Sequence, residues 1–292
     1  MSERVAYLIV LFGAVLWGTT GTAQAFIPRT VDPIIVATLR LAIGGFSLLL
    51  IMSLIGKLNF TKWPWKRTFV TAVCLAVFQY FFFSSVRLTG VAIGTVLSIG
   101  SAPVFAGIIE SVFLKKSPSR QWLIATILAI IGCSILFFNK ELVVFSPLGV
   151  MFALGAGMLF ALYTLANKTI VAQTGALRAV AVVFTLSAFM LLPFFFLFQS
   201  TGIMTRTGLL AILYIGIVTT SIGYVLFSTG LTKIPSSSAT TLALAEPLTA
   251  AILSVFVVGE YLNTSAWFGI FLLLGGIVVL SFKGNMETVA GR

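Results

Sequence analysis

The chain is dominated by ten runs of about 20 apolar residues, separated by short polar segments. A run of this length, wound into an α-helix, spans the hydrocarbon core of a bilayer. Strands of a porin-type barrel would be about half as long and would alternate in polarity. The sequence therefore predicts an all-α membrane protein with ten transmembrane helices, at residues 5–27, 34–55, 68–86, 91–114, 121–138, 148–167, 179–198, 208–230, 236–258 and 265–282.

The composition excludes a soluble globular fold and most enzyme chemistry. Of the 292 residues, 59% are hydrophobic and 9% are charged, whereas a soluble domain typically carries about 25% charge. Histidine is absent from the sequence, so there is neither an imidazole base nor a histidine metal ligand. We expect no enzyme activity, no metal and no cofactor. Cys74 and Cys133 lie inside apolar runs and are interpreted as small hydrophobic residues.

The basic residues predict how the chain is oriented in the membrane. Thirteen of the 18 Lys and Arg residues fall in the two tails and the even-numbered connections, and four fall in the odd-numbered connections. Basic residues accumulate on the cytoplasmic side of membrane proteins. We therefore expect a multi-pass protein of the inner (plasma) membrane with both termini in the cytoplasm. The net charge of +11 follows from this bias, and nucleic-acid binding, which needs a basic face, is not expected.

The sequence repeats itself at an offset of 144 residues, which predicts two domains, 1–144 and 145–292. Each half holds five runs, an odd number, so the second half would enter the membrane from the opposite side. Two inverted-topology five-helix repeats around a central cavity are a common plan of secondary transporters, in which one repeat rocks against the other. The matched positions include Gly13 and Gly157, Thr20 and Thr164, Tyr80 and Tyr224, Phe83 and Phe227, Ser84 and Ser228, and Pro103 and Pro247.

Several short motifs are spread along both halves: Trp17-Gly18, Arg40, Ile234-Pro235-Ser236-Ser237-Ser238-Ala239, Glu246-Pro247, Gly259-Glu260 and Gly275-Gly276. In these motifs the chain resembles the drug/metabolite transporter superfamily, in its ten-helix branch with two EamA-type domains. Within that branch it is most similar to the amino-acid exporters of the YddG type. The resemblance implies a basket of helices around a central cavity and transport of small metabolites across the inner membrane. One position departs from the pattern, since the first repeat has Lys116 where the second has Glu260.

Charged side chains inside the predicted helices are costly in a bilayer and are therefore candidates for function. Glu246 lies near mid-depth and either locks the helix kinked by Pro247 or acts as a cavity acid that binds a substrate amine or carries a proton. Arg40 either reaches toward the outer surface, binds a substrate carboxylate or pairs with Glu246. Glu110 lies about one turn from Lys115 and is interpreted as half of an interfacial ion pair. The coupling or gating candidates are Arg40, Glu246, Pro103 and Pro247.

Uncharged polar and aromatic residues share helical spacing in several of the runs. They either serve helix packing alone or line a cavity with aromatic walls and few hydrogen-bonding groups. Such a cavity suits small, partly apolar, neutral or zwitterionic solutes. The substrate-binding candidates are Trp17, Thr20, Gln24, Gln79, Tyr80, Phe83, Ser84, Tyr163, Asn167, Tyr224 and Ser228.

These features favour an inner-membrane secondary transporter that exports amino acids and related metabolites by alternating access, with broad specificity for aromatic and other small, partly apolar amino acids. Its partners would be a small-molecule substrate and the lipid bilayer, and a monomer is expected to function. The alternative is a drug exporter or a sugar/nucleotide-type metabolite exporter. A channel would need a filter of charges or carbonyls, and a membrane-embedded enzyme would need clustered acids. Neither pattern is evident, and proton coupling is left open.

Overall fold

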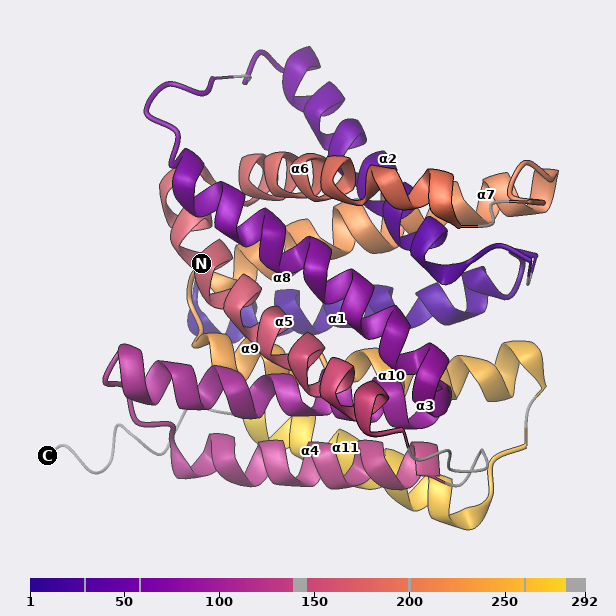
Figure 1. The fold of residues 1–292 in the computed structure, drawn as a ribbon. Helices are drawn as coiled ribbons and strands as arrows, with labels where there is room; N and C mark the ends of the chain where they lie inside the picture. Colours follow the sequence, from indigo (N-terminus) through magenta and orange to yellow (C-terminus); the bar gives the residue numbers. More distant parts are fainter. Residues whose placement is uncertain (29, 58, 139–145, 199–200, 260, 282–292) are drawn as a thin grey trace, which may run out of the picture.

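The computed structural model describes residues 1–28, 30–57, 59–138, 146–198, 201–259 and 261–281, which form helices joined by short turns (Figure 1). In this described part there is no β-strand. Two segments, η1 and η2, are π-helices. The elements are α1 Glu3–Gln24, α2 Pro33–Leu54, α3 Trp65–Phe113, α4 Arg120–Phe138, α5 Pro147–Thr174, α6 Ala176–Leu197, α7 Arg206–Tyr214, η1 Ile215–Ile222, α8 Gly223–Leu231, α9 Ser236–Leu242, α10 Ala245–Leu253, η2 Ser254–Val258 and α11 Thr264–Ser281.

The elements combine into ten membrane spans. Helix α3 is broken at Gly90, where φ is 86° and ψ is 163°, so it forms two spans, Trp65–Gly90 and Ile93–Phe113. Within the described residues nine helical segments are long and apolar enough to cross a bilayer, and the shorter apolar stretch Arg120–Leu136 of α4 adds a tenth. The prediction of an all-α membrane protein with ten spans is confirmed.

Side-chain caps and prolines set where several helices begin. The carboxylate of Asp32 accepts a hydrogen bond from the backbone N–H of Ile34 at 3.0 Å, and the hydroxyl of Ser146 accepts one from Gly149 at 3.3 Å. Each cap is followed by a proline in the first turn of α2 or α5, where its missing N–H costs nothing. These starts agree with the predicted boundaries to within a few residues.

One predicted connection, Lys168 to Arg178, is wrong. Helix α5 continues through it to Thr174, and the chain breaks only at Gly175, whose φ is 84°. The charge of Lys168 suggested a loop, but its ammonium group donates a hydrogen bond to the backbone carbonyl of Ile234. This acceptor on a neighbouring segment satisfies the ammonium group, so Lys168 can be accommodated inside a helix.

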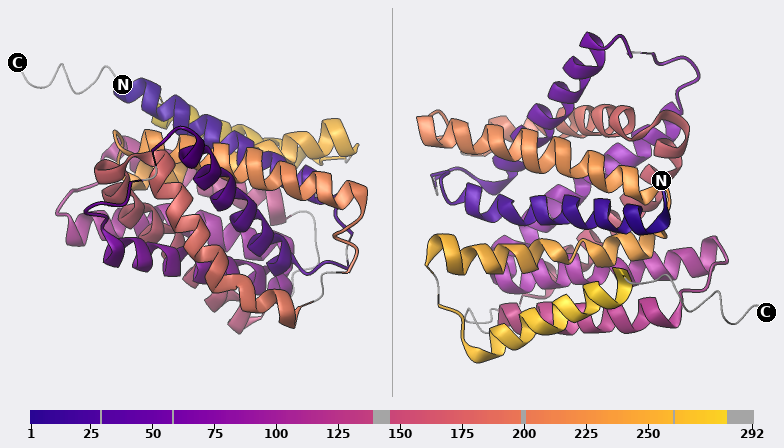
Figure 2. Two further views of the ribbon diagram at one scale, coloured as in Figure 1. Left: turned by 90° about the horizontal axis from the view of Figure 1, so that it is seen from above. Right: turned by 180° about the vertical axis from the view of Figure 1, so that it is seen from behind.

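The spans lie side by side and cross between two faces of the bundle. Helix α1 begins and α11 ends on one face, at the left in Figure 1, which we call the N-terminal side; α1 ends on the opposite side. Helices α4 and α11 pack together along one edge of the bundle in both Figure 1 and Figure 2. Their backbones touch at Gly132 and Gly269, where an added Cβ would come within 2.6–2.7 Å of the other glycine's carbonyl oxygen. Lipid provides no hydrophobic driving force for helix association, and the close packing at these glycines stabilises the pair through van der Waals contacts.

The eighth and ninth spans depart from regular α-helix around the middle of the bundle. The eighth passes through the π-helix η1, and the ninth breaks between α9 and α10 and ends in the π-helix η2. At the break between α9 and α10, Pro247 has no backbone N–H to donate. The N–H of Glu246 donates to the carbonyl of Ala243 at 2.9 Å. This break places the carboxylate of Glu246 at the first turn of α10, facing the interior of the bundle.

Candidate binding cavity

A cavity runs from the opposite side of the bundle to its middle. Its outer part, a vestibule of about 390 Å³, is lined near its mouth by Gln24, Pro33 and Val86. Its inner end, of about 50 Å³, adjoins the vestibule and lies deeper among α1, α2, α3, α5 and the eighth and ninth spans. The residues that line both parts are Trp17, Arg40, Phe82, Phe83, Ile99 and Glu246.

A side pocket of about 240 Å³ continues the mouth of the cavity along α2 and α3. It shares Pro33, Phe83 and Val86 with the vestibule. At its rim the guanidinium of Arg87 lies 3.5 Å from the carboxylate of Asp32, and 74% of the Arg87 side chain is exposed. A pair this exposed stabilises little.

The inner end of the cavity gathers polar atoms that have no hydrogen-bond partner among the described residues. They are the indole nitrogen of Trp17, Nε of Arg40, the hydroxyl of Thr220, and both polar atoms of the Gln79 amide. Gln79 is only 1% exposed. A buried polar group without a partner costs on the order of 1–3 kcal/mol. A ligand that supplied both hydrogen-bond donors and acceptors would remove this cost.

Two opposite charges face the same space. Arg40, from α2, and Glu246, from α10, line both parts of the cavity, and their charges interact with each other and with the hydroxyl of Tyr224. They form no direct ion pair, since in the described part of the chain the pair Arg87–Asp32 is the only one within 4.0 Å. The guanidinium and the carboxylate therefore face the cavity without being locked in an ion pair with each other.

Aromatic rings close the cavity toward the N-terminal side. The indole of Trp17 lies 4.3 Å from the ring centre of Tyr224 and 4.9 Å from that of Phe227. Phe160 and Phe184 pack around this pair, with ring centres 6.3 Å from Trp17 and 4.8 Å from Tyr224 respectively. This aromatic floor, built from Trp17, Phe160, Phe184, Tyr224 and Phe227, separates the cavity from the N-terminal side.

The family of the chain follows from comparison with known proteins. The profile of the EamA-like transporter family matches twice, at residues 4–138 and 147–282. The chain belongs to the EamA-like transporter family. The two matches also confirm the two-repeat architecture expected from the offset of 144 residues.

Two relatives match this transporter over nearly all of its length. It is 44% identical over 290 residues to "Uncharacterized transporter YwfM" of Bacillus subtilis, covering 99% of this chain and 98% of the relative. It is 24% identical over 298 residues to "Uncharacterized inner membrane transporter YicL" of Salmonella typhimurium, covering 99% of each chain. A solved crystal structure with 18% identity superposes with a TM-score of 0.84 over 95% of this chain and 96% of that one, which supports the fold. The protein is thus a multi-pass membrane transporter.

The structure divides the predicted binding residues of the transporter into three levels. The first group lines the cavity, the second lines the side pocket at its mouth, and the third is buried beneath the aromatic floor. Pro103 is buried inside α3 and is not among the residues that line the cavity or its side pocket. The first group is Trp17, Thr20, Gln24, Arg40, Gln79, Phe83, Tyr224, Glu246 and Pro247; the second is Tyr80, Phe83 and Ser84; and the third is Tyr163, Asn167 and Ser228.

The third group serves packing in this conformation. The amide nitrogen of Asn167 donates a hydrogen bond to the hydroxyl of Ser228 at 2.9 Å, and both residues are fully buried. Tyr163 stacks on Phe160 with ring centres 6.0 Å apart. The first of these contacts joins α5 to α8 beneath the cavity, and the second lies within α5.

Several lining residues were not identified from the sequence. Thr219 and Thr220 line the inner end of the cavity from η1, and Ser98 lines it from α3. Thr220 precedes Tyr224 by four residues, a spacing that would place both on one face of an α-helix. Helical spacing from Tyr224 could therefore have identified Thr220, whereas it could not have identified Thr219, which lies one residue earlier in the π-helix η1.

The prediction that Glu110 forms an interfacial ion pair with Lys115 is wrong. Glu110 is 6% exposed, and its carboxylate accepts hydrogen bonds from the backbone N–H of Ser236 at 2.6 Å and of Ser237 at 3.3 Å. The hydroxyl of Ser237 also donates to it. The free N–H groups and positive end of the helix dipole at the start of α9 bind a carboxylate, whereas Lys115 remains exposed.

Proposed function

We propose that this transporter exports amino acids across the inner membrane by alternating access, with broad specificity for aromatic and other small, partly apolar side chains. The observation that carries the proposal is the placement of Arg40 and Glu246 in one cavity without a direct ion pair. A zwitterion carries one group for each of them. The carboxylate of the substrate would bind Arg40, and its ammonium group would bind Glu246.

The rest of the cavity favours broad recognition of the side chain. Phe82, Phe83 and Ile99 line both parts of the cavity and offer apolar contact without direction. The unpartnered amide of Gln79 and hydroxyl of Thr220 line the inner end of the cavity together with the charged pair. The ammonium and carboxylate groups of the substrate would be recognised by specific polar contacts, whereas its side chain would be selected only by size and polarity.

The proposed orientation places the open cavity on the outside. The bias of basic residues toward the tails and even-numbered connections puts both termini in the cytoplasm. The N-terminal side is then cytoplasmic, and the vestibule opens outward. In this reading the aromatic floor is the closed cytoplasmic gate, and a single chain contains the whole pathway.

Alternating access is supported by comparing the two repeats at the offset of 144 residues. Thr20, Phe83 and Thr95 line the open vestibule in the first repeat. Their counterparts in the second repeat, Thr164, Phe227 and Ala239, are fully buried at 0% exposure. Repeats of inverted topology would exchange these roles when the carrier turns inward.

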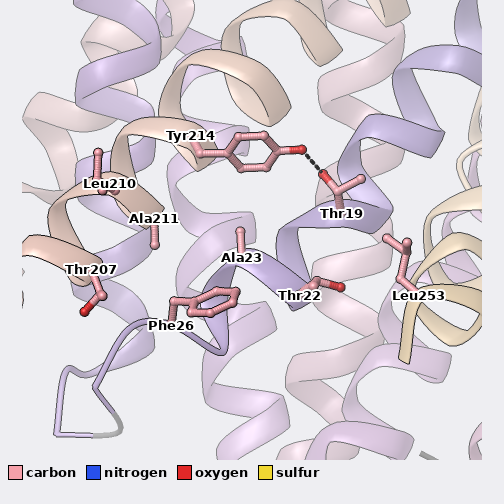
Figure 3. Close-up of a pocket in the computed structure, with 9 residues that line it drawn as sticks. All are labelled: Thr19, Thr22, Ala23, Phe26, Thr207, Leu210, Ala211, Tyr214 and Leu253. Atoms are coloured by element: carbon pink, nitrogen blue, oxygen red, sulfur yellow. Dashed lines mark hydrogen bonds between the residues drawn. The ribbon is translucent and has the colours of Figure 1, made fainter. Parts of the chain in front are cut away.

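A second candidate, a drug exporter, is favoured by one separate observation. An apolar pocket of about 450 Å³ lies between α1, α7 and Leu253 (Figure 3). The hydroxyls of Thr19 and Tyr214 satisfy each other there at 2.9 Å, so the pocket offers mainly apolar contact. A lipophilic substrate that used this pocket would need neither Arg40 nor Glu246.

Counterflow in proteoliposomes distinguishes the two candidates. Vesicles loaded with unlabelled phenylalanine should take up labelled phenylalanine. Phenethylamine, which lacks the carboxylate, and N-acetylphenylalanine, which lacks the ammonium, should not exchange for it. The three compounds share one aromatic ring, so they differ in their charged groups and not in the apolar side chain. Exchange of all three, or of non-amino-acid compounds alone, would contradict the amino-acid proposal and favour the drug exporter.

A further inference from the structure

The cytoplasmic ends of three helices are tied together by contacts that the binding cavity does not use. The buried carboxylate of Glu110, near the end of α3, holds the first two N–H groups of α9. The ammonium of Lys168, on α5, donates to the carbonyl of Ile234, just before α9. We call this set, Glu110, Lys168, Ile234, Ser236 and Ser237, the inner clamp.

The inner clamp lies where the carrier would have to open to the cytoplasm. Ser236 and Ser237, which bind the carboxylate of Glu110, lie within one helical turn of Ala239. The counterpart of Ala239 in the first repeat is Thr95, which lines the open outer vestibule. Opening an equivalent inner vestibule requires α9 to move away from α5 and from the end of α3. The inner clamp resists that movement because each of its bonds joins segments far apart in the chain.

The offset of 144 residues identifies the equivalent positions on the outer side. Lys168 corresponds to Gln24, and Ile234 corresponds to Gly90. Gly90 is the break in α3, just as Ile234 precedes the start of α9. Gln24 now lines the wall of the open vestibule, and its side-chain amide, like the lysine ammonium, is a hydrogen-bond donor.

We infer that Glu110 and Lys168 are positioning residues of the cytoplasmic gate, and that Gln24 donates to the carbonyl of Gly90 as the equivalent outer contact when the carrier turns inward. This inference rests on the proposed alternating access. The outer set is weaker than the inner clamp, since Gln24 is uncharged and the counterpart of Glu110 is Ser254. The empty carrier therefore rests with its cytoplasmic side closed.

Thiol labelling tests the inner clamp without a substrate. In a background of Cys74→Ser and Cys133→Ala, the probe Ala239→Cys reports opening to the cytoplasm and the probe Thr95→Cys reports opening to the outside. Inside-out and right-side-out vesicles are treated with a membrane-impermeant maleimide. Lys168→Met and Glu110→Gln should each raise the labelling rate of the inner probe, by about tenfold for loss of a hydrogen bond to a charged group, and lower that of the outer probe.

Exposed charges on the same side provide matched controls. Lys66→Met and Glu3→Gln remove a lysine and a glutamate that are exposed to solvent, and neither should change the labelling of either probe. If Lys168→Met and Glu110→Gln also leave both rates within about twofold of the parent, the inner clamp does not hold the gate.

Gln24 gives the outer contact a test in both directions. Gln24→Lys restores the charge found at the equivalent position and should favour the inward-facing form, so labelling rises at Ala239→Cys and falls at Thr95→Cys. Gln24→Leu removes the donor and should do the reverse. Equal responses to both variants would overturn the outer contact. If labelling follows these expectations but phenylalanine counterflow is absent, the gate is supported and only the proposed substrate is rejected. If counterflow is present but labelling does not respond to the variants, the substrate is supported and the gate is rejected.

Discussion

At the scale of single residues, Gln79 shows how a binding site can be recognised from a buried polar group that lacks a hydrogen-bond partner. Its amide is buried and has no partner among the described residues, yet it faces the inner end of the cavity. Buried side-chain amides usually have hydrogen-bond partners; the amide nitrogen of the buried Asn167 donates to Ser228, whereas neither polar atom of the Gln79 amide is paired. The amide is therefore best explained by a substrate that pairs with it.

Replacing Gln79 should separate stability from transport. We expect Gln79→Leu to leave the unliganded protein as stable as the parent or up to about 1–3 kcal/mol more stable, because an unpaired buried amide is removed. Phenylalanine counterflow should fall by at least about tenfold, the equivalent of about 1.4 kcal/mol of substrate binding. Thermal unfolding in detergent and counterflow measure the two effects.

Gln121 provides the matched control for this substitution. Its amide nitrogen donates to the carbonyl of Val279 at 2.6 Å, so it joins α4 to α11 away from the cavity. Gln121→Leu should destabilise the protein by about 1 kcal/mol and leave the half-saturation concentration of phenylalanine unchanged. A loss of stability in Gln79→Leu equal to that in Gln121→Leu would mean that Gln79 is structural.

The sequence predicted individual residues unevenly, for reasons that are physical. Arg40 and Glu246 were identified because charge inside an apolar run is rare and costly. Glu110 was misassigned because the positive end of α9 that binds it lies 126 residues away in the chain, and no local pattern announces such a contact. Helical spacing and the internal repeat predict that Asn167 and Ser228 line the cavity, but in this conformation they are buried under its floor.

At the scale of helices, the placement of Glu246 depends on how closely α1 approaches α10. Gly18 sits at the contact: an added Cβ would come within 2.4 Å of Cβ of Thr249 and 2.6 Å of the carbonyl oxygen of Glu246. Gly21, one turn further along α1, has no atom within 4 Å of an added Cβ. The two glycines thus share a helix but differ in their surroundings.

These glycines give opposite predictions for the same change. Gly18→Ala should push α10 away from α1 and destabilise the protein by about 1–3 kcal/mol, the usual cost of overpacking, and it should raise the half-saturation concentration by displacing Glu246. Gly21→Ala should be neutral or stabilising by up to about 1 kcal/mol, because alanine is the better helix former. Thermal unfolding of both variants tests this, and equal shifts of Tm would contradict the close contact.

Helix boundaries were predictable where the chain itself determines them. The starts of α2 and α5 follow from Asp32-Pro33 and Ser146-Pro147, which combine a cap with a proline. The extension of α5 through Lys168 was not predictable, since its hydrogen-bond acceptor belongs to another span. The π-helical turns at η1 and η2 are not marked by any pattern of hydropathy, so hydropathy predicts the spans but not their internal phase.

At the scale of the whole molecule, the repeats share a fold but have diverged in chemistry. Arg40 corresponds to Phe184 and Glu246 to Ala102 at the offset of 144 residues, so each repeat contributes one charge to the cavity. Neither repeat alone could bind a zwitterion through both charges. A substrate held by Arg40 and Glu246 therefore connects the two units that must move relative to each other.

This arrangement predicts that export is driven by the proton gradient, because a proton and the substrate's ammonium compete for the carboxylate of Glu246. Outside, a proton would displace the substrate; in the cytoplasm, substrate would displace the proton. A gradient of one pH unit is worth about 1.4 kcal/mol, or about tenfold in steady-state accumulation for one proton per substrate. Labelled phenylalanine in proteoliposomes, with and without the gradient, measures this ratio.

Two acid-to-amide variants make the prediction specific to Glu246. Glu246→Gln keeps the shape of the side chain but cannot bind a proton in exchange for an ammonium group, so gradient-driven accumulation should disappear. Asp32→Asn removes an acid at the mouth of the cavity while asparagine still caps α2, and it should retain the full response. Because both variants remove one negative charge, a general electrostatic effect would weaken both. Full accumulation in Glu246→Gln would show that the proton moves elsewhere, and a parent protein indifferent to the gradient would be a facilitated exporter.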